Sequence, residues 1–303
     1  MSFDLKHIDP NNYLGPLLSF GLVSVAVIFY FMVHGVPWII QPDDSEFTVI
    51  ELAEFSEQLE ESSALAQFNG LLWTLNDSGA AAVIHSLGPN GSEQASFTLS
   101  GADNVDWESM AHDNEFLYVA DTGNNANTRD AFTIYRIAWL ALLSGEAEAE
   151  KIELRYGDYE PGNPISHNFD AEGLTVRGEE LWLFTKNRGD RQSNLYRFPK
   201  LPGNYAPEPQ QQLPVDALVT AADINPETGE LALLGVRRNR QTYLWRAPTS
   251  DEGVDWSRMV ELEIQPADQW EAVLWDTEQQ RLLLTHERNS RRYAGLAELK
   301  PGM

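Results

Sequence analysis

The sequence predicts an all-β fold, a five-bladed β-propeller closed by an N-terminal strand and preceded by a single transmembrane helix. Three observations support this prediction. Acid-bearing turns recur at steps of 47, 64, 51 and 48 residues, a period typical of repeat arrays and propellers. Each turn introduces several short apolar strands, and an uncharged stretch of 20 residues lies near the N-terminus. The turns are centred on Glu61, Glu108, Glu172, Asp223 and Glu271.

The uncharged stretch, LGPLLSFGLVSVAVIFYFMV at residues 14–33, predicts a membrane anchor. At about 1.5 Å per residue its length matches a hydrocarbon core of about 30 Å. A cleaved signal peptide is the alternative, although it would have a basic start, a shorter apolar run and small residues before the cut. Because Lys6 precedes the stretch and the next lysine or arginine is Arg129, the positive-inside rule places the N-terminus in the cytoplasm.

These features divide the chain into four segments. We expect a short cytoplasmic N-terminus at 1–12, a transmembrane anchor at 13–40, an acidic linker at 41–46 and a β-propeller domain at 47–303. The protein is therefore expected in the inner, or cytoplasmic, membrane, with its propeller in the periplasm or outside the cell.

Four strands make up each predicted blade. The acid-bearing turn leads into a short first strand, and the second strand is apolar, as in LWLFTKNR at residues 181–188. The third strand ends in an aromatic residue followed by arginine in three units, and a more polar fourth strand completes the first four units, as in KIELRYGD at residues 151–158. One helix is expected, AWLALLSGEAEAE at residues 138–150, and it accounts for the step of 64 residues.

The N-terminal part of the propeller is expected to close the ring. The last unit has three strands before Met303, so one outer strand is missing there. The segment EFTVIELAEF at residues 46–55 precedes the first unit and has no other partner. Pairing it with the last unit would leave no open edge. This count predicts five blades, or six if the region around the long step has been divided wrongly.

The composition excludes several classes of function. With 46 acidic and 21 basic residues the formal net charge is −25, and such a surface repels phosphate backbones, so no nucleic-acid partner is expected. The absence of cysteine excludes disulfides, thiolate metal sites and cysteine nucleophiles. No G-x-S-x-G elbow, Walker loop or zinc-ligand spacing is present, so no catalytic residue is assigned.

Two phrases carry a resemblance to known proteins. DWESMA…LYVADTGNN…FTIYRI and FDAEGLTV…LWLFTKNR…LYRFP resemble bacterial extracytoplasmic β-propeller proteins close to the SdiA-regulated and esterase-like phytase families. The likeness covers residues 60–298. It implies an extracytoplasmic propeller and calcium at acidic loops.

Carboxylates at the inner strands are candidate metal ligands. Because these strands converge on a central axis, equivalent turns would bring Glu108, Glu172, Asp223 and Glu271 into a ring, with Glu61 a weaker match. Carboxylates packed in this way raise one another's pKa, and a Ca²⁺ ion with about six to eight oxygen ligands would relieve the repulsion. The alternatives are that each acid caps backbone N–H groups or pairs with an arginine, or that the ring is catalytic.

A second set of polar residues follows the second strands and could bind an anionic or zwitterionic ligand at the mouth of the channel. Turn formation and solvated loop charges are the alternatives, since Asp in a turn bonds to its own backbone two residues on. The residues are Asp77, Asp121, Lys186, Arg188, Arg238, His286 and Glu287.

Two functions fit these patterns. The first is a membrane-anchored binding or scaffold module, an accessory subunit or partner of an inner-membrane protein complex, with other membrane or extracytoplasmic proteins as its contacts. The second is a Ca²⁺-dependent hydrolase that acts on a phosphate ester, lactone or ester, where calcium would polarise the substrate. The absence of a catalytic motif favours the first, non-enzymatic function.

Overall fold

A computed structural model of the chain describes residues 47–77, 79–159, 167–290 and 292–301. The predicted N-terminal segment, anchor and linker, at 1–12, 13–40 and 41–46, lie outside these residues. Within the described part of the chain no helix is long and apolar enough to cross a membrane.

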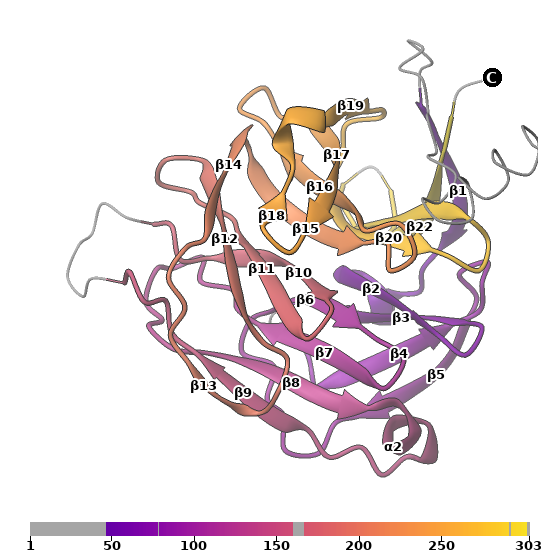
Figure 1. Cartoon of the computed structure of the whole chain (residues 1–303). Coiled ribbons are helices and arrows are strands. Elements are labelled where there is room, and N and C mark those ends of the chain that lie inside the picture. Colours follow the sequence, from indigo (N-terminus) through magenta and orange to yellow (C-terminus); the bar gives the residue numbers. More distant parts are fainter. Residues whose placement is uncertain (1–46, 78, 160–166, 291, 302–303) are drawn as a thin grey trace, which may run out of the picture. The chain divides into compact units, whose positions relative to one another are not determined.

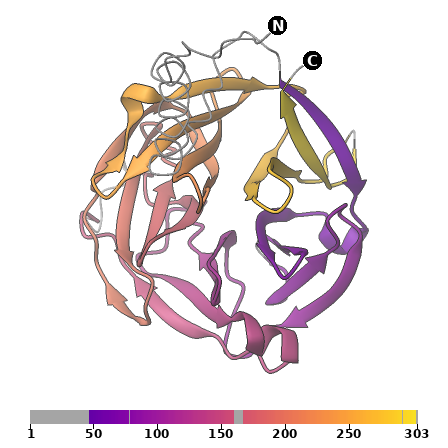
Figure 2. The ribbon, with the colours of Figure 1, turned by 45° about the vertical axis from the view of Figure 1, so that its right-hand side comes forward.

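The described strands form five sheets, and the chain visits them in order around a ring (Figures 1 and 2). Blades 1 to 3 each begin with their inner strand. Blade 1 contains β2 (Ser62–Phe68), β3 (Leu71–Asn76), β4 (Val83–Leu87) and β5 (Glu93–Thr98). Blade 2 contains β6 (Trp107–His112), β7 (Phe116–Asp121), β8 (Phe132–Ala138) and β9 (Glu150–Leu154), and β13 (Gly203–Tyr205) adds to its outer edge. Blade 3 contains β10 (Ala171–Arg177), β11 (Glu180–Thr185), β12 (Gln192–Pro199) and β14 (Gln211–Asp216).

The last two blades complete the ring. Blade 4 contains β15 (Leu218–Ile224), β16 (Glu230–Val236), β17 (Thr242–Ser250) and β19 (Val260–Ile264), and a short β18 (Gly253–Val254) pairs with the end of β17. Blade 5 contains β20 (Trp270–Asp276), β21 (Arg281–His286), β22 (Gly295–Pro301) and β1 (Phe47–Glu54). The inner strands β2, β6, β10, β15 and β20 each contact the next, and β20 contacts β2, so the five-bladed prediction is confirmed.

The first strand of the propeller is the outer strand of the last blade. β1 runs antiparallel to β22, with the register extending from Phe47 opposite Pro301 to Glu54 opposite Gly295. Figure 2 shows these two strands, indigo and yellow, side by side. The N-terminal strand therefore closes the ring, as predicted, and covers an edge of β22 that would otherwise be open.

The hydrophobic core is divided among the spaces between neighbouring blades. The described residues form five buried clusters, and each cluster takes side chains from two adjacent blades. Along β11, Leu181 and Leu183 face blade 2, whereas Trp182 and Phe184 face blade 4. Because both faces of a blade are buried near its second strand, the second strands β3, β7, β11, β16 and β21 are buried at nearly every position and do not alternate, whereas the outer strands β5 and β14 are largely polar.

The predicted helix is shorter than expected. Helix α2 covers only Trp139–Ser144, because Gly145 adopts the left-handed conformation (φ 76°) and its N–H bonds back to Leu142. The following EAEAE segment is not helical, and Glu150 already belongs to β9. Two short 3-10 helices, η1 (Glu57–Leu59) and η2 (Trp256–Arg258), lie in connections.

Candidate functional site

Each inner strand carries a β-bulge near its first residue. At every bulge the register with the second strand shifts and one residue is left out of the pairing. A bulge bends its strand and re-aims the side chain of the extra residue. The extra residues are Ser63, Glu108, Glu172, Thr220 and Glu271. Three of the five bulges therefore place a glutamate at the same end of the ring, which we call the acidic end.

Five carboxylates meet at the acidic end, and we call them the acidic cluster. The oxygens of Asp77, Asp106 and Glu108 lie within 4.8 Å of one another, and so do those of Glu108, Asp170 and Glu172. Glu108 belongs to both groups. Asp170 and the two glutamates are at most 5% exposed, whereas Asp77 and Asp106 are half-buried.

Two basic side chains neutralise one half of the acidic cluster. Lys186, which follows β11, forms an ion pair with Glu172 through its Nζ atom. Arg188 Nε lies 2.9 Å from Asp170 Oδ2, and Arg188 Nη2 lies 3.6 Å from Glu172 Oε1. Asp170 also accepts the backbone N–H of Asn124 at 2.9 Å. The half formed by Asp170 and Glu172 thus has partners for its charges.

The other half contains a carboxylate oxygen without a partner. Neither Asp106 nor Glu108 forms an ion pair with a described residue, and Glu108 Oε1 is buried with no hydrogen-bond partner among them. A buried acceptor left without a hydrogen bond costs about 1–3 kcal/mol, and more when it is charged. A Cβ atom added at Gly123 would collide with both the Asp106 and the Glu108 carboxylates. Asp106 and Glu108 therefore both pack against the backbone of Gly123, where any residue with a Cβ atom would clash with them.

The pKa values of Asp106 and Glu108 also indicate that these two acids lack nearby positive charge. Burial and the carboxylate of Glu172 raise the pKa of Glu108 well above its ordinary value, against the opposing charge of Lys186. Burial and the carboxylate of Asp77 raise the pKa of Asp106 to about 6. A cation placed among these oxygens would favour the ionised forms and lower both pKa values.

Asp121 positions the acidic cluster rather than joining it. This buried residue ends β7, and its Oδ1 atom accepts the backbone N–H of Asp106 at 3.1 Å. Arg129 Nη2 lies 2.8 Å from the same oxygen and satisfies its charge. Asp121 and Arg129 thus fix the loop from which Asp106 enters the site.

Two further glutamates extend the acidic end toward blade 5. Glu271 occupies the bulge of β20, and Glu287 follows β21. Burial raises the pKa of Glu287 to about 8, and the charges of Glu271 and Asp77 add to the rise. Burial also raises the pKa of Glu271, against the opposing charge of Lys186. The structure therefore brings Glu108, Glu172 and Glu271 to equivalent positions of three blades.

Asp223 does not lie at the acidic end. The bulge of β15 is occupied by Thr220, and Asp223 follows three residues later, near the other end of the strand. Its carboxylate accepts the backbone N–H of Trp275 at 2.8 Å and a hydroxyl from Thr175 at 3.4 Å. Asp223 thus bonds the inner strand of blade 4 to those of blades 3 and 5.

Arg238 and His286 also lie apart from the acidic cluster. The Arg238 side chain is 66% exposed and lies 3.6 Å from the exposed Asp216. His286 is buried, and its Nε2 atom lies 3.2 Å from Glu51 of the closing strand β1. Of the ligand residues expected from sequence, the structure brings Asp77, Lys186, Arg188 and Glu287 together at the acidic end.

Sequence reasoning missed two members of the acidic cluster. Asp106 and Asp170 each stand two residues before a bulge glutamate, in the segments Asp-Trp-Glu and Asp-Ala-Glu. The repeated Asp-x-Glu spacing was a usable signal. Both acids of each pair belong to the acidic cluster, so this spacing marks the two loop acids as well as the bulge glutamates.

Comparison with solved structures finds propellers of diverse kinds at low sequence identity. The chain is similar to an exo-β-1,3-galactanase from Phanerochaete chrysosporium, with a TM-score of 0.54 and 10% identity over 84% of this chain and 64% of that one. It is also similar to a chain of Kuenenia stuttgartiensis hydrazine synthase, with a TM-score of 0.43 and 12% identity over 83% and 60% of the two chains. A nidogen/laminin complex contains a third similar chain, with a TM-score of 0.45 and 11% identity over 78% and 82%.

The likeness to the galactanase shows the β-propeller fold alone. The chain spans less than two thirds of the galactanase and hydrazine synthase chains. No model of a protein family matches the sequence, and no curated protein does. The fold is one often used as a binding or scaffold module. The resemblance to the SdiA-regulated and esterase-like phytase families stays a prediction.

Proposed function

We propose that this protein is a binding module whose acidic end holds a divalent cation, Ca²⁺, between Asp77, Asp106 and Glu108. The observation that carries the proposal is the buried Oε1 atom of Glu108, which has no hydrogen-bond partner among the described residues. A cation bound there would satisfy this oxygen and relieve the repulsion among three carboxylates whose oxygens lie within 4.8 Å of one another.

The positions of the basic residues favour a cation between Asp77, Asp106 and Glu108 over one between Asp170 and Glu172. Lys186 and Arg188 already pair with Glu172 and Asp170, so a cation among those acids would meet two positive charges. Carboxylate oxygens are the ligands that Ca²⁺ prefers, and the irregular spacing of loop and bulge acids suits its flexible coordination better than the strict octahedron of Mg²⁺.

We further propose that the module is held at the cytoplasmic membrane by the segment at 13–40 and serves as an accessory subunit of a membrane protein complex. The support comes from the uncharged stretch in the sequence and from a fold often used for binding. Affinity purification of the full chain from detergent-solubilised native membranes tests this role. We expect a partner complex of fixed stoichiometry that is lost when residues 47–303 are deleted. Recovery of the full chain alone would contradict the role.

Calcium binding is tested by thermal unfolding of the full chain. A free Ca²⁺ concentration about 100 times the dissociation constant should stabilise the protein by about 2.7 kcal/mol, which corresponds to a rise of roughly 5–10 °C in Tm. Glu108→Gln should abolish most of this rise, whereas Glu115→Gln, at an exposed acid of the same blade, should leave it unchanged. An equal rise in both variants would refute the site.

A Ca²⁺-dependent hydrolase is the second candidate, and one observation favours it. Lys186 and Arg188 both lie beside Glu172, whose pKa is raised by burial, and groups with shifted pKa values are concentrated at active sites. Turnover of generic phosphate ester, lactone and ester substrates with added Ca²⁺ distinguishes the two functions. The binding module predicts no turnover, and a turnover that Glu108→Gln removes would favour the hydrolase.

A further inference from the structure

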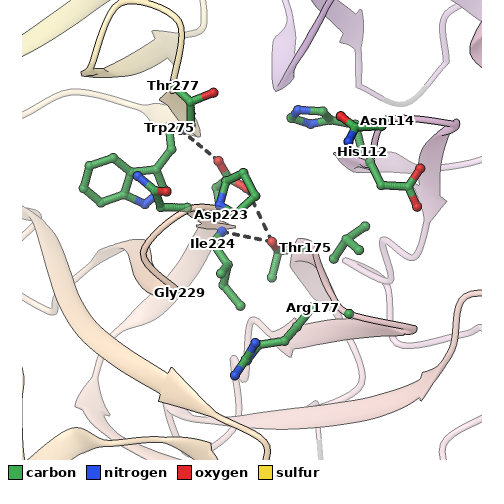
Figure 3. A pocket seen from close by; sticks show the side chains of 14 residues that line it. His112, Asn114, Thr175, Arg177, Asp223, Ile224, Gly229, Trp275 and Thr277 are labelled. Carbon is green, nitrogen blue, oxygen red and sulfur yellow. Dashed lines mark hydrogen bonds between the residues drawn. The ribbon is translucent and has the colours of Figure 1, made fainter. Parts of the chain in front are cut away.

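The end of the ring opposite the acidic end is formed where the inner strands finish and turn toward their second strands, and we call it the pocket end. Figure 3 shows part of it: Asp223 of β15 lies between Thr175 of β10 and Trp275 of β20, beside a pocket of about 240 Å³. Because successive strands of a blade are antiparallel, the third strand of each blade also ends at the pocket end. The segments that follow the third strands therefore belong to this end.

The closing strand β1 begins at the pocket end. Its first residue, Phe47, pairs with Pro301, whereas its last residue, Glu54, pairs with Gly295. Gly295 in turn pairs with His286, which lies opposite the first residue of β20. The inner strand β20 begins at the acidic end, so β1 runs from the pocket end toward the acidic end.

A short linker limits how far the pocket end can lie from the predicted anchor. The anchor at 13–40 and the linker at 41–46 are outside the described residues. An extended chain spans at most about 3.3–3.6 Å per residue, so Phe47 lies within about 25 Å of residue 40. β1 has 8 residues and, at about 3.3 Å each, is itself about 26 Å long. Placing the acidic end against a membrane would therefore require the linker to be fully extended along the whole height of the ring.

Three exposed leucines also lie at the pocket end, in segments that follow third strands. Helix α2 follows β8 and buries Trp139 and Leu142 in the core on one side. Its other side leaves Leu140 79% exposed and Leu143 37% exposed. Leu201, which follows β12, is 54% exposed. Large apolar side chains of two blades are thus open to solvent at this end.

The two leucine-bearing segments meet at one turn of the ring, the turn between β6 and β7. The indole N–H of Trp139 donates to the backbone carbonyl of Asp113 in this turn at 2.9 Å. Lys200 Nζ lies 3.2 Å from the carboxylate of the same aspartate. Single exposed apolar residues are common on soluble proteins, but apolar side chains gathered on one surface mark a site of contact. We therefore treat Leu140, Leu143 and Leu201 as one surface, the leucine surface.

The charges around the leucine surface exclude attraction to anionic lipids. Lys200 is paired with two acids, at 3.2 and 3.3 Å, and Arg177 lies 3.5 Å from Asp251. Glu115 and Glu146 are exposed and add negative charge beside the leucines. A membrane with a negative surface potential attracts basic segments and would repel these acids. A lipid surface without net charge is the one that this end suits.

We propose that the pocket end lies against the membrane surface, with the leucine surface inserted among the headgroups of zwitterionic lipids and the acidic end facing the aqueous side. The inference rests on the membrane anchor proposed above. The starting point of β1 and the positions of the leucines are separate observations, and both select the same end of the ring. Apolar side chains at a membrane interface are buried about 5–10 Å deep, at the boundary between headgroups and acyl chains.

Quenching of single fluorophores by lipid tests this inference. The chain has no cysteine, so one labelling site can be introduced at a time. The full chain is reconstituted in phosphatidylcholine vesicles that contain lipids with a nitroxide quencher near the top of the acyl chain. Val105→Cys is the matched control for Leu140→Cys, because Val105 is also apolar and is 58% exposed, but lies in the loop that enters the acidic end. Quenching should be at least about threefold stronger at Leu140→Cys than at Val105→Cys.

A further variant tests whether the leucines cause the contact. A label at Leu201→Cys should be quenched as well, and adding Leu140→Ser and Leu143→Ser should reduce this quenching at least about twofold. Both serines replace exposed side chains, so the fold should be unaffected.

Flotation of the vesicles separates this inference from the proposed anchor. A full chain that does not float with the vesicles would refute the anchor and the inference together. A chain that floats, but whose Leu140→Cys label is quenched no more than its Val105→Cys label, would overturn the inference and leave the anchor standing. A Leu140→Cys label shielded from aqueous iodide yet unaffected by the lipid quencher would show that a second copy of the chain covers the leucine surface, and this result too would overturn the inference.

Discussion

The Asp223 carboxyl should make the protein less stable as the pH rises, and Asp223→Asn should remove this dependence. Burial raises the pKa of Asp223 from 3.8 to about 7, although hydrogen bonds from Trp275 and Thr175 oppose the rise. Between these two pKa values the folded state binds a proton that the unfolded state has released. The contribution of Asp223 to stability is therefore most favourable below about pH 4 and falls until about pH 7.

The size of this effect follows from the pKa difference. Three pKa units correspond to about 4 kcal/mol at most. Because Asp223 lines a pocket and is only partly buried, solvent screens part of this cost, and we expect about 2 kcal/mol. The asparagine side chain of the variant would keep an oxygen for the Trp275 N–H but would carry no charge. As the pH rises from about 4 to about 8, the free energy of unfolding of the variant should therefore increase by about 2 kcal/mol relative to that of the wild type. This corresponds to about 4–8 °C in Tm.

Urea and thermal unfolding of the two proteins across this pH range measure the difference. Glu227→Gln is the matched control, because it removes an exposed acid from the turn that follows β15. The free energy of unfolding of Glu227→Gln should stay within about 0.5 kcal/mol of the wild-type value at every pH. The reasoning would be refuted if the difference in free energy of unfolding between Asp223→Asn and the wild type stayed constant, or became smaller, as the pH rises.

Three further predictions concern the core, the ion pair and the closing strand. Trp139→Ala should lower the free energy of unfolding in urea by about 3–5 kcal/mol, because the indole is fully buried. Leu140→Ala, at a residue that is 79% exposed, should change this free energy little. Similar losses in the two variants would contradict the packing. Lys186→Gln should cost toward the lower end of about 3–5 kcal/mol, because buried Glu172 would keep only Arg188, 3.6 Å away, as a charged partner. The double variant with Glu172→Gln should recover part of this loss, and additive effects would exclude the coupling. Deletion of residues 47–54 should lower Tm and cause self-association in analytical ultracentrifugation through the exposed edge of β22, and a monomer with unchanged Tm would contradict this.

The fold could be predicted from sequence because its local signals and its packing agree. Both faces of each blade are buried, so FLYVAD and LWLFT are apolar at nearly every position, and their regular recurrence indicates a ring. The closing strand could be predicted because a missing outer strand leaves an edge that another segment must cover. The helix was predicted too long because EAEAE favours a helix locally, whereas Gly145 ends it and the outer strand β9 takes over at Glu150.

The site could be predicted only in part, because its geometry depends on strand register. Glu108, Glu172 and Glu271 were found because each stands at the same place in its unit. Asp223 was grouped with them by spacing alone, yet the bulge of β15 falls at Thr220. A bulge is a property of the pairing between two strands, and the spacing of acids along one strand does not reveal where the pairing shifts.

The bulges explain why acidic side chains gather at one end of a nearly regular ring. Each bulge offers an extra side chain that packs outside the ladder, so its identity can change without altering the strands around it. The bulge residue is neutral in blades 1 and 4, where Ser63 and Thr220 stand, and acidic in the other three. In blade 3 Lys186 supplies the compensating charge from the neighbouring strand, and in blade 2 the unpartnered oxygen of Glu108 remains. The acids beside blade 2 therefore suit a cation better than those beside blade 3, because Glu108 and Asp106 form no ion pair with a lysine or arginine in the described part of the chain, whereas Glu172 and Asp170 do.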